Sequence, residues 1–517
     1  MSSEFFTGVD AAWLRMDRPG NLAQIAGVMI FDAPMERSRL IELIHERLLV
    51  YDRFRQRVRE LPFGLGLPRW EDDPQFDMNY HLSPISLPAP GGQAELQRLV
   101  GDLMSQPLDH AHPLWRFYYV ENYQGGCALV SVLHHCIADG LALVQVLLAM
   151  TDPQPEASAF QRSTPTDRAA VIRSGMPPTR PLALLMGATS SLARTTAREM
   201  LLTLTEPSRV TQAVSLGALG VSAAAKLLLT SPDQKTLING SCGVEKRAAW
   251  SAAIPLSDVV RVGRALRGTV NDVLLTAATG ALRRYLEQRG QDPTGVNLRA
   301  MVPVSIRASK DLSKLGNQFG LVILSLPVGV RDPVQRLHVL KQRMDDIKDT
   351  PEALVAFSVL GLMGLTPHQI EKLLIDFFAA KTSAVMTNVP GPRRPIYLAG
   401  QRLNSLMFWV PRAGDIGLGL SILSYAGNVY IGIATDAGLM PDPQAIVDAY
   451  QAELNDLLRL VSPARSAYAP IKQPSASDRS ANGRCHALTK AGTPCRNRAL
   501  PDSEFCGVHT KQLQPPA

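Results

Sequence analysis

The sequence lacks any apolar run as long as the roughly 18 residues that a membrane-spanning helix needs. Its most apolar stretches, residues 141–150 and 353–365, are shorter and predict buried or interfacial helices. The N-terminus also lacks a basic segment followed by an apolar one, which a secretory signal would require. These absences predict a cytoplasmic chain without a transmembrane helix, whose contact with membranes is peripheral.

Cysteine and charge are both sparse. Six cysteines in 517 residues give no disulfide framework for a cytosolic protein of this size, although three of them lie within the last 35 residues. Charged residues make up 19% of the chain and apolar residues 46%, a balance that excludes disordered and fibrous proteins. The net charge of +7 is modest for this length and favours anionic partners such as phospholipid surfaces, nucleic acids or phosphate-bearing small molecules.

The length requires more than one hydrophobic core, so we expect separate domains. Residues 1–160 combine helical and strand periodicity, which predicts an α/β domain with strands at 25–31 and 127–134 and helices near 40–48 and 96–104. Residues 246–462 predict a second α/β domain, with helices at 269–287, 333–348 and 443–460 and strands at 298–306 and 320–327. Two strand runs on either side of Ala426-Gly427-Asn428 predict a hairpin.

The remaining segments predict connections. Residues 161–245 predict a linker and a helical crossover, in which residues 181–232 carry long helical patterns rich in Ala, Gly and Leu. That segment fits either an amphipathic stretch at a membrane interface or a crossover packed on the protein itself. Residues 463–480 are rich in Pro and Ser and predict a second linker, which leaves residues 481–511 as a short tail.

The most informative segment is ALVSVLHHCIADGLALVQVLLAM, residues 128–150. A buried strand leads into His134 and His135, and a short turn, Asp139, Gly140 and an apolar helix follow. Neighbouring side chains on a strand point to opposite faces, so one histidine can face a channel while the other packs into the fold. A carboxylate such as Asp139 is favoured at a helix N-terminus, and Gly140 permits a backbone conformation or a close approach that a side chain would block.

This arrangement suits proton transfer. An imidazole with an ordinary pKa of about 6.5 can remove a proton from an alcohol at neutral pH. An aspartate that bonds groups of the turn can hold such an imidazole in place. The alternative is a pair of core histidines that only satisfy hydrogen bonds, and it accounts less well for the combination of strand, histidine pair, turn, Asp-Gly and helix.

HHCIADG resembles HHxxxDG, the signature of the bacterial wax ester synthase/diacylglycerol acyltransferase family. Condensation domains of peptide synthetases share this motif, and the chloramphenicol acetyltransferase superfamily shares HxxxDG, so other segments must distinguish these groups. The segments that resemble the family, in the family's order, are DAAWLRMD at 10–17, RFRQRV at 53–58, Pro113-Leu114-Trp115, Asn271-Asp272 and NVPGP at 388–392. The resemblance covers residues 5–462.

The resemblance implies an α/β (α+β) fold of two subdomains similar to chloramphenicol acetyltransferase or condensation domains, with mixed sheets flanked by helices. It also implies an active site in a channel between them, where His135 deprotonates the acceptor hydroxyl and the alkoxide attacks an acyl-CoA thioester. His134 accompanies the base, and Asp139 is structural, with Arg55 as its expected partner. No serine or cysteine nucleophile is needed, so Cys136 is not expected to act as one.

The other motifs also have plain structural explanations. Pro113-Leu114-Trp115 can serve packing alone, since tryptophan buries a large surface. Asn271-Asp272 can cap a helix, whereas the family resemblance places the pair near the active site. Asn388, Pro390 and Gly391 belong to a tight turn that, by the same resemblance, borders the tunnel for CoA or the acyl chain.

The tail carries Cys485, Cys495, Cys506 and His509 within RCHALTKAGTPCRNRALPDSEFCGVH. Three thiols and an imidazole are the ligand set of a structural zinc site, Cys506-x-x-His509 is a chelating pair, and His486 is a competing ligand. A polar segment this short needs a metal to stay folded, which predicts zinc. The alternative is a disordered tail with incidental cysteines. The tail lies outside the family resemblance.

Together these observations predict an acyl-CoA-dependent O-acyltransferase that esterifies diacylglycerol, a long-chain fatty alcohol or both. We expect catalysis without a cofactor, contact with a peripheral membrane or lipid-droplet surface, and no nucleic-acid partner. Two alternatives stay open: a condensation-type acyltransferase with carrier-bound donors, and a non-catalytic lipid-binding or scaffold protein. Whether free acyl-CoA suffices as donor separates the first alternative, and the intact HHxxxDG motif argues against the second.

Overall fold

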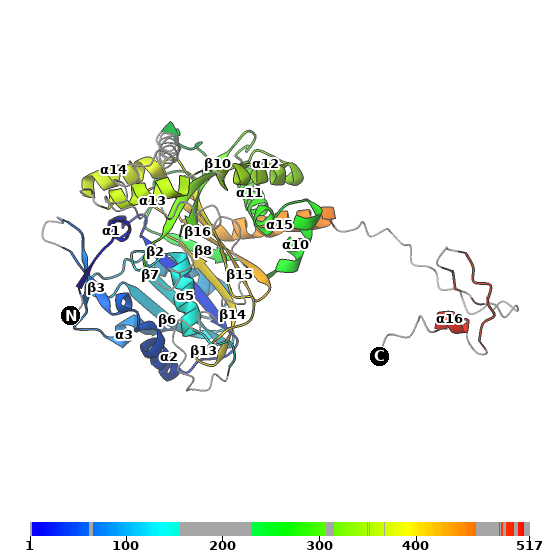
Figure 1. Cartoon of the computed structure of the whole chain (residues 1–517), viewed down its shortest axis with the longest axis horizontal. Coiled ribbons are helices and arrows are strands. Elements are labelled where there is room, and N and C mark those ends of the chain that lie inside the picture. Colours follow the sequence, from blue (N-terminus) through cyan, green and yellow to red (C-terminus); the bar gives the residue numbers. More distant parts are fainter. Residues whose placement is uncertain are drawn as a thin grey trace, which may run out of the picture. The chain divides into compact units, whose positions relative to one another are not determined.

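The computed structural model describes residues 3–60, 66–155, 229–306, 315–348, 350, 352–364, 366, 368–461, 485, 487–489, 493–500 and 505–510. The chain divides into two units, Met1–Val461 and Ser462–Ala517. Most of the predicted crossover, residues 161–228, and the predicted linker 463–480 lie outside the described residues. The first unit contains the α/β architecture that the sequence predicts, with helices packed around mixed sheets (Figure 1).

The first sheet is built around the strand that ends in the histidine pair. Among the described residues its order is β13-β14-β2-β7-β6-β5. β7 (Gly126–His134) pairs antiparallel with β2 (Gln24–Phe31) and β6 (Trp115–Tyr123), and β5 (Leu82–Ile85) pairs parallel with β6. β7 is buried on both faces apart from half-buried Ser131, which explains its almost uninterrupted apolar sequence. The strands predicted at 25–31 and 127–134 are confirmed.

Two strands of this first sheet come from the second half of the chain. β14 (Gln401–Trp409) pairs antiparallel with β2, and β13 (Tyr397–Leu398) pairs with β14. The sequence predicts that residues 246–462 form a C-terminal subdomain, and these two strands of that range belong to the first sheet. The first sheet therefore depends on both halves of the chain, and the halves cannot separate without breaking its ladder.

The second sheet has the order β11-β10-β12-β15-β16-β8. Its strands are β8 (Lys246–Trp250), β10 (Leu298–Ser305), β11 (Phe319–Leu326), β12 (Ala384–Pro390), β15 (Leu418–Tyr425) and β16 (Asn428–Asp436), with β9 (Ile254–Pro255) paired to β16. The predicted hairpin is β15–β16, and Ala426 and Gly427 both have positive φ, 47° and 82°, as a two-residue type I′ turn requires. A small antiparallel sheet is formed by β1 (Ser3–Phe5), β4 (Arg69–Asp72) and β3 (Gln56–Arg59).

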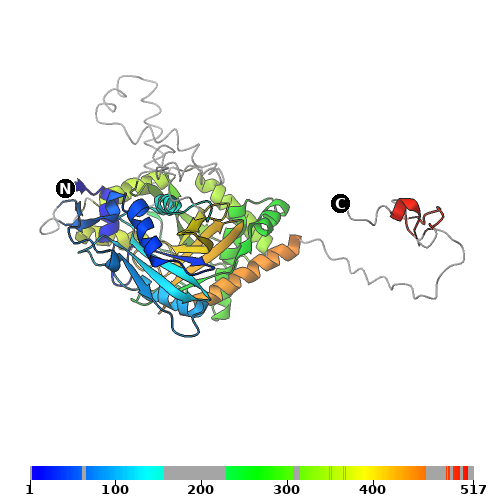
Figure 2. The ribbon, with the colours of Figure 1, turned by 90° about the horizontal axis from the view of Figure 1, so that it is seen from below.

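The helices of the first unit cover these sheets. They are α1 (Gly8–Arg15), α2 (Arg37–Leu43) with a π-helical turn Ile44–Leu48, a 3₁₀ turn Asp52–Phe54, α3 (Met78–His81), α4 (Gln93–Met104), α5 (Gly140–Met150), α10 (Leu256–Ala265), α11 (Val270–Gln288), α12 (Pro333–Lys348), α13 (Glu352–Met363), α14 (His368–Ala379) and α15 (Pro443–Val461). The helix predicted at 333–348 coincides with α12, and the orange helix α15 packs against α11 (Figures 1 and 2). The prediction at 40–48 is divided between α2 and the π-helical turn.

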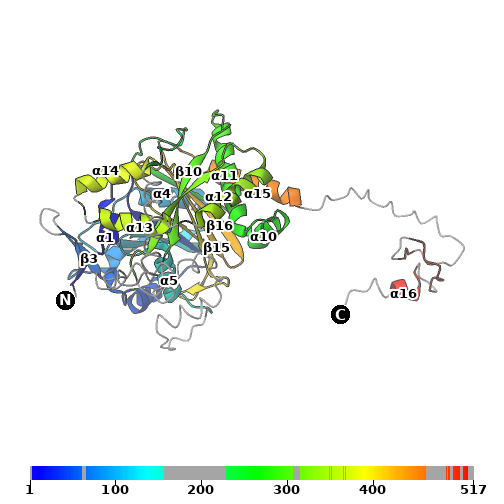
Figure 3. The same ribbon diagram turned by 45° about the horizontal axis from the view of Figure 1, so that its top comes forward.

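Helices α1 and α13 lie side by side (Figure 3) because glycines let their backbones meet. A Cβ atom at Gly8 would lie 2.4 Å from the carbonyl oxygen of Gly361, and one at Gly364 would overlap the backbone of Gly8. Only glycine fits such an approach. This contact fixes α1, and α1 carries two residues of the candidate site.

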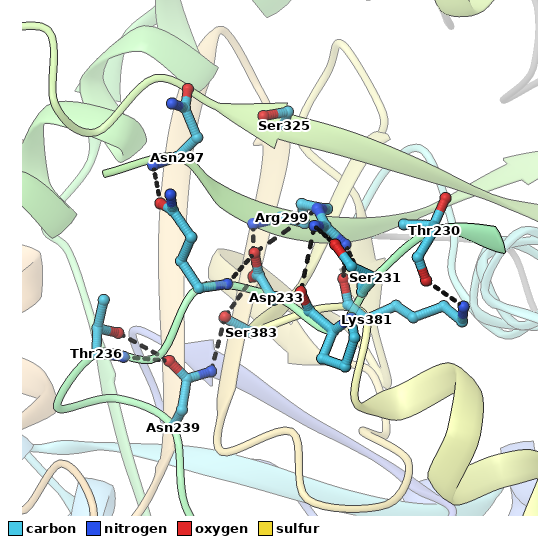
Figure 4. Close-up of polar contacts among 12 residues, drawn as sticks. Thr230, Ser231, Asp233, Thr236, Asn239, Asn297, Arg299, Ser325, Lys381 and Ser383 are labelled. Carbon is cyan, nitrogen blue, oxygen red and sulfur yellow. Dashed lines mark hydrogen bonds and ion pairs between the residues drawn. The ribbon is translucent and has the colours of Figure 1, made fainter. Parts of the chain in front are cut away.

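The chain enters the second sheet through residues 230–239, which are fastened by hydrogen bonds (Figure 4). The Asp233 carboxylate accepts from the Arg299 backbone N–H at 2.8 Å and from the Ser383 hydroxyl at 2.5 Å, so it joins β10 to the residue before β12. The Arg299 guanidinium donates to the carbonyl oxygen of Ser231 at 2.7 Å. These residues therefore contact the second sheet although they precede the boundary that the sequence predicts after residue 245.

Among the described helices, none combines the length and the apolar character that crossing a bilayer requires.

Candidate active site

The turn between β7 and α5 holds both histidines of the motif. β7 ends at His134, and Asp139 is the N-cap of α5, where its Oδ1 accepts a hydrogen bond from the Ala142 N–H at 2.9 Å. The strand, turn, cap and helix therefore follow the order that the sequence predicts. Figure 1 shows α5 across the face of the first sheet, so the turn lies at the edge where β7 and α5 meet.

His135 is buried between aromatic rings. Its ring is stacked on Trp13, with centroids 4.1 Å apart and planes at 22°, and Phe319 lies 5.5 Å away. Burial lowers the pKa of His135 to about 4, although the negative charge of Asp139 acts to raise it. The imidazole is therefore neutral at neutral pH. Its Nδ1 is buried and has no hydrogen-bond partner among the described residues.

His134 packs into the protein instead. Its Nδ1 accepts from the Cys136 N–H at 3.1 Å, and its Nε2 lies 3.3 Å from the Asp17 carboxylate. Although burial raises the pKa of Asp17, the neighbouring rings of His110 and His134 hold that pKa below its ordinary value. An ionised Asp17 thus fixes the His134 ring. The two histidines differ in environment, as the alternation of side chains on a strand predicts.

Arg53 binds the turn between β7 and α5. Its Nη1 donates to the carbonyl oxygens of Ile137 at 2.8 Å and Cys136 at 3.3 Å, and its Nη2 pairs with the buried carboxylate of Asp10 at 3.1 Å. A guanidinium presents several donors in a fixed plane, so one side chain can satisfy both carbonyls and the carboxylate. Arg53 is therefore a positioning residue for the turn.

Our assignment of Arg55 was wrong. Its guanidinium donates to Asp52 at 2.6 Å and to the Leu49 carbonyl oxygen, and both Arg55 and Asp52 are exposed to solvent. The 3₁₀ turn Asp52–Phe54 decides the difference, because it directs Arg53 inward and Arg55 outward. The arginine of RFRQRV that supports the turn is thus Arg53, two positions earlier.

A loop of the second half completes the support. Asn317 Nδ2 donates to the His135 carbonyl oxygen and to Asp10, both at 2.8 Å. The Gln318 N–H donates to Asp139 Oδ2 at 2.9 Å. Asp139 therefore joins the cap of α5 to the second half of the chain. Sequence reasoning missed Asp10, Arg53 and Asn317; the first two lie in segments that resemble the family, and Asn317 has no local sequence signal.

Gly140 has a different role from the one we predicted. Its φ is not positive, and a Cβ atom there would meet no atom within 4 Å, so neither an unusual backbone nor a close approach requires glycine. Gly140 instead borders an apolar cavity between α5, β2, β7 and β14, which we call the first cavity. Its lining includes Ile25, Met29, Leu133, Leu143, Leu147 and Leu406.

A second apolar cavity lies on the side of Trp13. It is enclosed by α1, β10, β11, α13 and α14, and its lining includes Trp13, Met301, Leu321, Leu360, Ile375 and Phe378. Trp13 lines this cavity and also stacks on His135. The motif thus borders the first cavity at Gly140, and Trp13 connects His135 with the second.

The PLW segment is part of the core around the turn. Trp115 is completely buried, and its Nε1 donates to the Phe54 carbonyl oxygen at 2.9 Å. The Leu114 carbonyl oxygen accepts from the His134 N–H at 2.9 Å, and Pro113 is also buried. These contacts support the packing explanation and add that Leu114 helps to position the histidine pair.

The structure brings two further motifs together. Asn388 Nδ2 donates to Asn271 Oδ1 at 2.9 Å, although the residues are 117 positions apart. Asp272 forms a capping box with Thr269 at the start of α11, so half of the Asn-Asp pair is a helix cap. Pro390 ends β12, and a Cβ atom at Gly391 would lie 2.4 Å from the Ser424 carbonyl oxygen, which requires glycine there.

Cys136 is buried inside the turn. Burial raises the pKa of its thiol well above the ordinary value. The thiolate, which is the nucleophilic form, is therefore disfavoured. This environment agrees with our expectation that Cys136 is not a nucleophile.

In the second unit, the structure brings together the four predicted metal ligands. The sulfurs of Cys485, Cys495 and Cys506 and a ring nitrogen of His509 all lie within 4.8 Å of one another. This cluster can hold a metal ion. The competing candidate His486 lies outside the described residues.

Comparison with known proteins identifies the family. The family model described as wax ester synthase/diacylglycerol acyltransferase catalytic domain matches residues 6–274, and the model described as WS/DGAT C-terminal domain matches residues 315–458. A Mycobacterium tuberculosis protein named "Probable diacyglycerol O-acyltransferase tgs1" is 32% identical over 447 residues, covering 84% of this chain and 92% of that protein.

Two solved structures share the fold. The wax ester synthase/diacylglycerol acyltransferase from Marinobacter aquaeolei VT8 matches with a TM-score of 0.62 and 20% identity, covering 87% of this chain and 98% of that one. The first condensation domain of the calcium-dependent antibiotic synthetase matches with a TM-score of 0.56 and 14% identity, covering 89% of this chain and 97% of that one. The family matches and the relative, which span both halves of the first unit, show that the chain is an acyltransferase belonging to the wax ester synthase/diacylglycerol acyltransferase family.

Proposed function

We propose that the protein transfers a fatty acyl group from acyl-CoA to the hydroxyl of diacylglycerol or a long-chain fatty alcohol, with His135 as general base. The observation that carries the proposal is the environment of His135, a neutral imidazole stacked on Trp13 beside apolar space. A neutral imidazole can accept the proton of an alcohol, and apolar surroundings suit lipid substrates.

The reaction then proceeds in two steps. A ring nitrogen of His135 takes the proton of the acceptor hydroxyl as its oxygen attacks the thioester carbonyl carbon, and a tetrahedral intermediate forms. The carbon–sulfur bond then breaks, the ester is released, and the proton passes from the imidazolium to the CoA sulfur. The thioester is already an activated acyl donor, so neither an acyl-enzyme nor a cofactor is required.

The protein's contribution to these steps is to hold the base. The carbonyl oxygens of residues 135–137 accept from Asn317 and Arg53, and Asp139 binds the N–H groups of Ala142 and Gln318. Because these contacts come from both halves of the chain, the imidazole can be positioned before substrates arrive. Such preorganisation reduces the entropy that must be lost in the transition state.

We assign the first cavity to the acyl chain and the second to the acceptor lipid. The helices α13 and α14, which wall the second cavity, also expose large apolar side chains on their outer faces. Leu362, Ile370, Leu373 and Phe377 are 43–70% exposed. A lipid held against these faces lies next to the wall of the second cavity, which favours entry of the acceptor from this side.

The same surface supports a peripheral contact with membranes or lipid droplets. On α14, Glu371 is buried and Asp376 pairs with Arg18 at 2.5 Å, while Lys372 is exposed. The outer face therefore combines apolar side chains with a basic one, which suits an anionic phospholipid surface.

The variant Leu373→Glu/Phe377→Glu should sediment less with phosphatidylglycerol vesicles than the wild type or the control Leu460→Glu, and equal sedimentation would contradict this contact.

The donor distinguishes the proposed function from its nearest alternative. Purified protein is given palmitoyl-CoA with dipalmitoylglycerol or hexadecanol, and the ester is identified by mass spectrometry. A parallel reaction supplies palmitate on an acyl carrier protein. Ester from free palmitoyl-CoA supports the proposal, and the better acceptor identifies the main product. Ester only from the carrier-bound donor would replace it with a condensation-type reaction, and no ester from either donor would favour a non-catalytic role.

A further inference from the structure

The Cys/His cluster of the second unit has the dimensions of a tetrahedral metal site. His509 Nδ1 lies 3.5 Å from Cys485 Sγ and 3.3 Å from Cys506 Sγ, and Cys495 Sγ lies 4.0 Å from Cys506 Sγ. Zinc bond lengths of about 2.3 Å to sulfur and 2.0–2.1 Å to nitrogen give a tetrahedron whose edges are about 3.6 Å between sulfur and nitrogen and about 3.8 Å between two sulfurs. These three separations match those edges to within a few tenths of an ångström, and all four ligand atoms lie within 4.8 Å of one another.

The ligands also form the interior of this unit. The buried cluster described here consists of Cys485, Cys495 and Cys506, with Ala487 and Phe505 packed against them. The regular structure around it is a bridge between Leu488 and Pro494 and the four-residue helix α16 (Gly507–Thr510). Three small thiols bury too little surface to stabilise such a segment. A bound metal can supply the missing free energy.

The surroundings of the sulfurs are typical of thiolate ligands. They are free thiols rather than a disulfide. Asn497 Nδ2 donates to Cys506 Sγ at 3.7 Å, and the Cys485 N–H donates to the Asn497 carbonyl oxygen at 2.9 Å. Donors to a metal-bound sulfur orient it and offset its charge. The basic residues Arg496 and Arg498 follow the ligand Cys495 closely in sequence, which favours a site of net negative charge.

We propose that Cys485, Cys495, Cys506 and His509 bind one structural Zn²⁺, which folds residues 485–510 as a module independent of acyl transfer. Soft thiolates with one imidazole in a four-coordinate set select zinc over magnesium, calcium or manganese. Four protein ligands leave no open position for substrate, so the ion is structural. The family match ends at residue 458, which places this site outside the acyltransferase.

The test uses the full chain and measures bound metal by mass spectrometry of the purified protein. We expect about one zinc per chain in the wild type and at least a tenfold lower content in Cys506→Ala and His509→Ala. His509→Cys supplies a fourth thiolate and should retain zinc. The matched control is Cys242→Ala, which removes a half-buried cysteine of the first unit and should leave the zinc content unchanged.

Two further readouts separate ligation from misfolding. Cobalt-substituted wild type should show the charge-transfer and d–d bands of a tetrahedral thiolate site, and Cys506→Ala should lose them. Acyl transfer by Cys506→Ala should stay within about twofold of the wild type. Zinc retained in both alanine variants, or a wild type without zinc after purification in zinc-containing buffer, would overturn the site. A parallel loss of zinc and activity would overturn the independence of the module.

Discussion

The ring of Trp13 is stacked on that of His135, with 4.1 Å between their centroids and 22° between their planes. The two residues are 122 positions apart, and Trp13 is placed by α1, whose backbone meets that of α13 at glycines. The stack removes one face of the imidazole from water. Burial of this kind disfavours the charged form and lowers the pKa of His135 to about 4.

This relationship predicts the pH dependence of the reaction. A depressed pKa keeps the proposed base neutral until the pH falls close to 4, so kcat/KM should have an acidic limb near that value. Trp13→Ala exposes the ring, and the limb should move upward toward the ordinary value of 6.5. The variant should therefore lose more activity at pH 5.5 than at pH 8. Trp13→Phe should keep the limb low, and an unchanged limb in Trp13→Ala would contradict the account.

Substitutions of Arg53 and Arg55 compare a buried ion pair with an exposed one. Arg53→Ala leaves the buried carboxylate of Asp10 without its cation, which should lower the free energy of unfolding by about 3–5 kcal/mol. Because the turn loses its support, kcat should fall more than KM rises, and Arg53→Lys should restore part of kcat. Arg55→Ala removes an exposed pair and should change stability by about 0–1 kcal/mol.

Urea unfolding and steady-state kinetics of the three variants check this prediction. Similar effects of Arg53→Ala and Arg55→Ala would show that the turn does not depend on the buried guanidinium.

Gly140 should control the length of the acyl chain. Side chains at this position project into open space beside the first cavity, so Gly140→Ala and Gly140→Val should reduce transfer from palmitoyl-CoA progressively. Transfer from hexanoyl-CoA should change by less than about twofold, since a short chain leaves room for the new side chain. Ala265→Val, at an exposed position of α10, controls for substitution in a helix. An equal loss with both donors would contradict the assignment of this cavity.

Cys136 should be dispensable for the chemistry. The buried thiol has a raised pKa, so Cys136→Ala should retain kcat within a few-fold, and the small cavity should cost about 1–2 kcal/mol of stability. Mass spectrometry of the wild type incubated with palmitoyl-CoA alone should detect no acyl-enzyme. A covalent adduct at Cys136, or loss of activity in a folded variant, would point to a thiol nucleophile.

Local signals in the sequence were sufficient for the motif and its elements. An uninterrupted apolar strand, a capping aspartate and an apolar helix predict the β7–turn–α5 unit, and the Ala-Gly turn predicts the β15–β16 hairpin. Each of these depends on residues close in the chain. The cluster of potential metal ligands was also predictable, because three cysteines and a histidine lie within 25 residues of one another in the sequence.

The contacts that hold the motif were harder to predict from the sequence. Which arginine of RFRQRV points inward depends on a three-residue 3₁₀ turn, and a shift of two positions reverses the answer. Asn317 reaches His135 across 182 positions, and β13 and β14 join a sheet whose other described strands lie in the first half. Such pairings depend on the whole fold, and neither composition nor periodicity encodes them locally.

The central claim, that His135 is the general base, is tested most directly by acceptor-dependent release of CoA from palmitoyl-CoA. His135→Ala should reduce kcat/KM by about 100- to 10,000-fold with hexadecanol or dipalmitoylglycerol while the protein stays folded. His45→Ala, at an exposed histidine, should leave the rate unchanged. A folded His135→Ala protein that still releases CoA at close to the wild-type rate in the presence of acceptor would contradict the account.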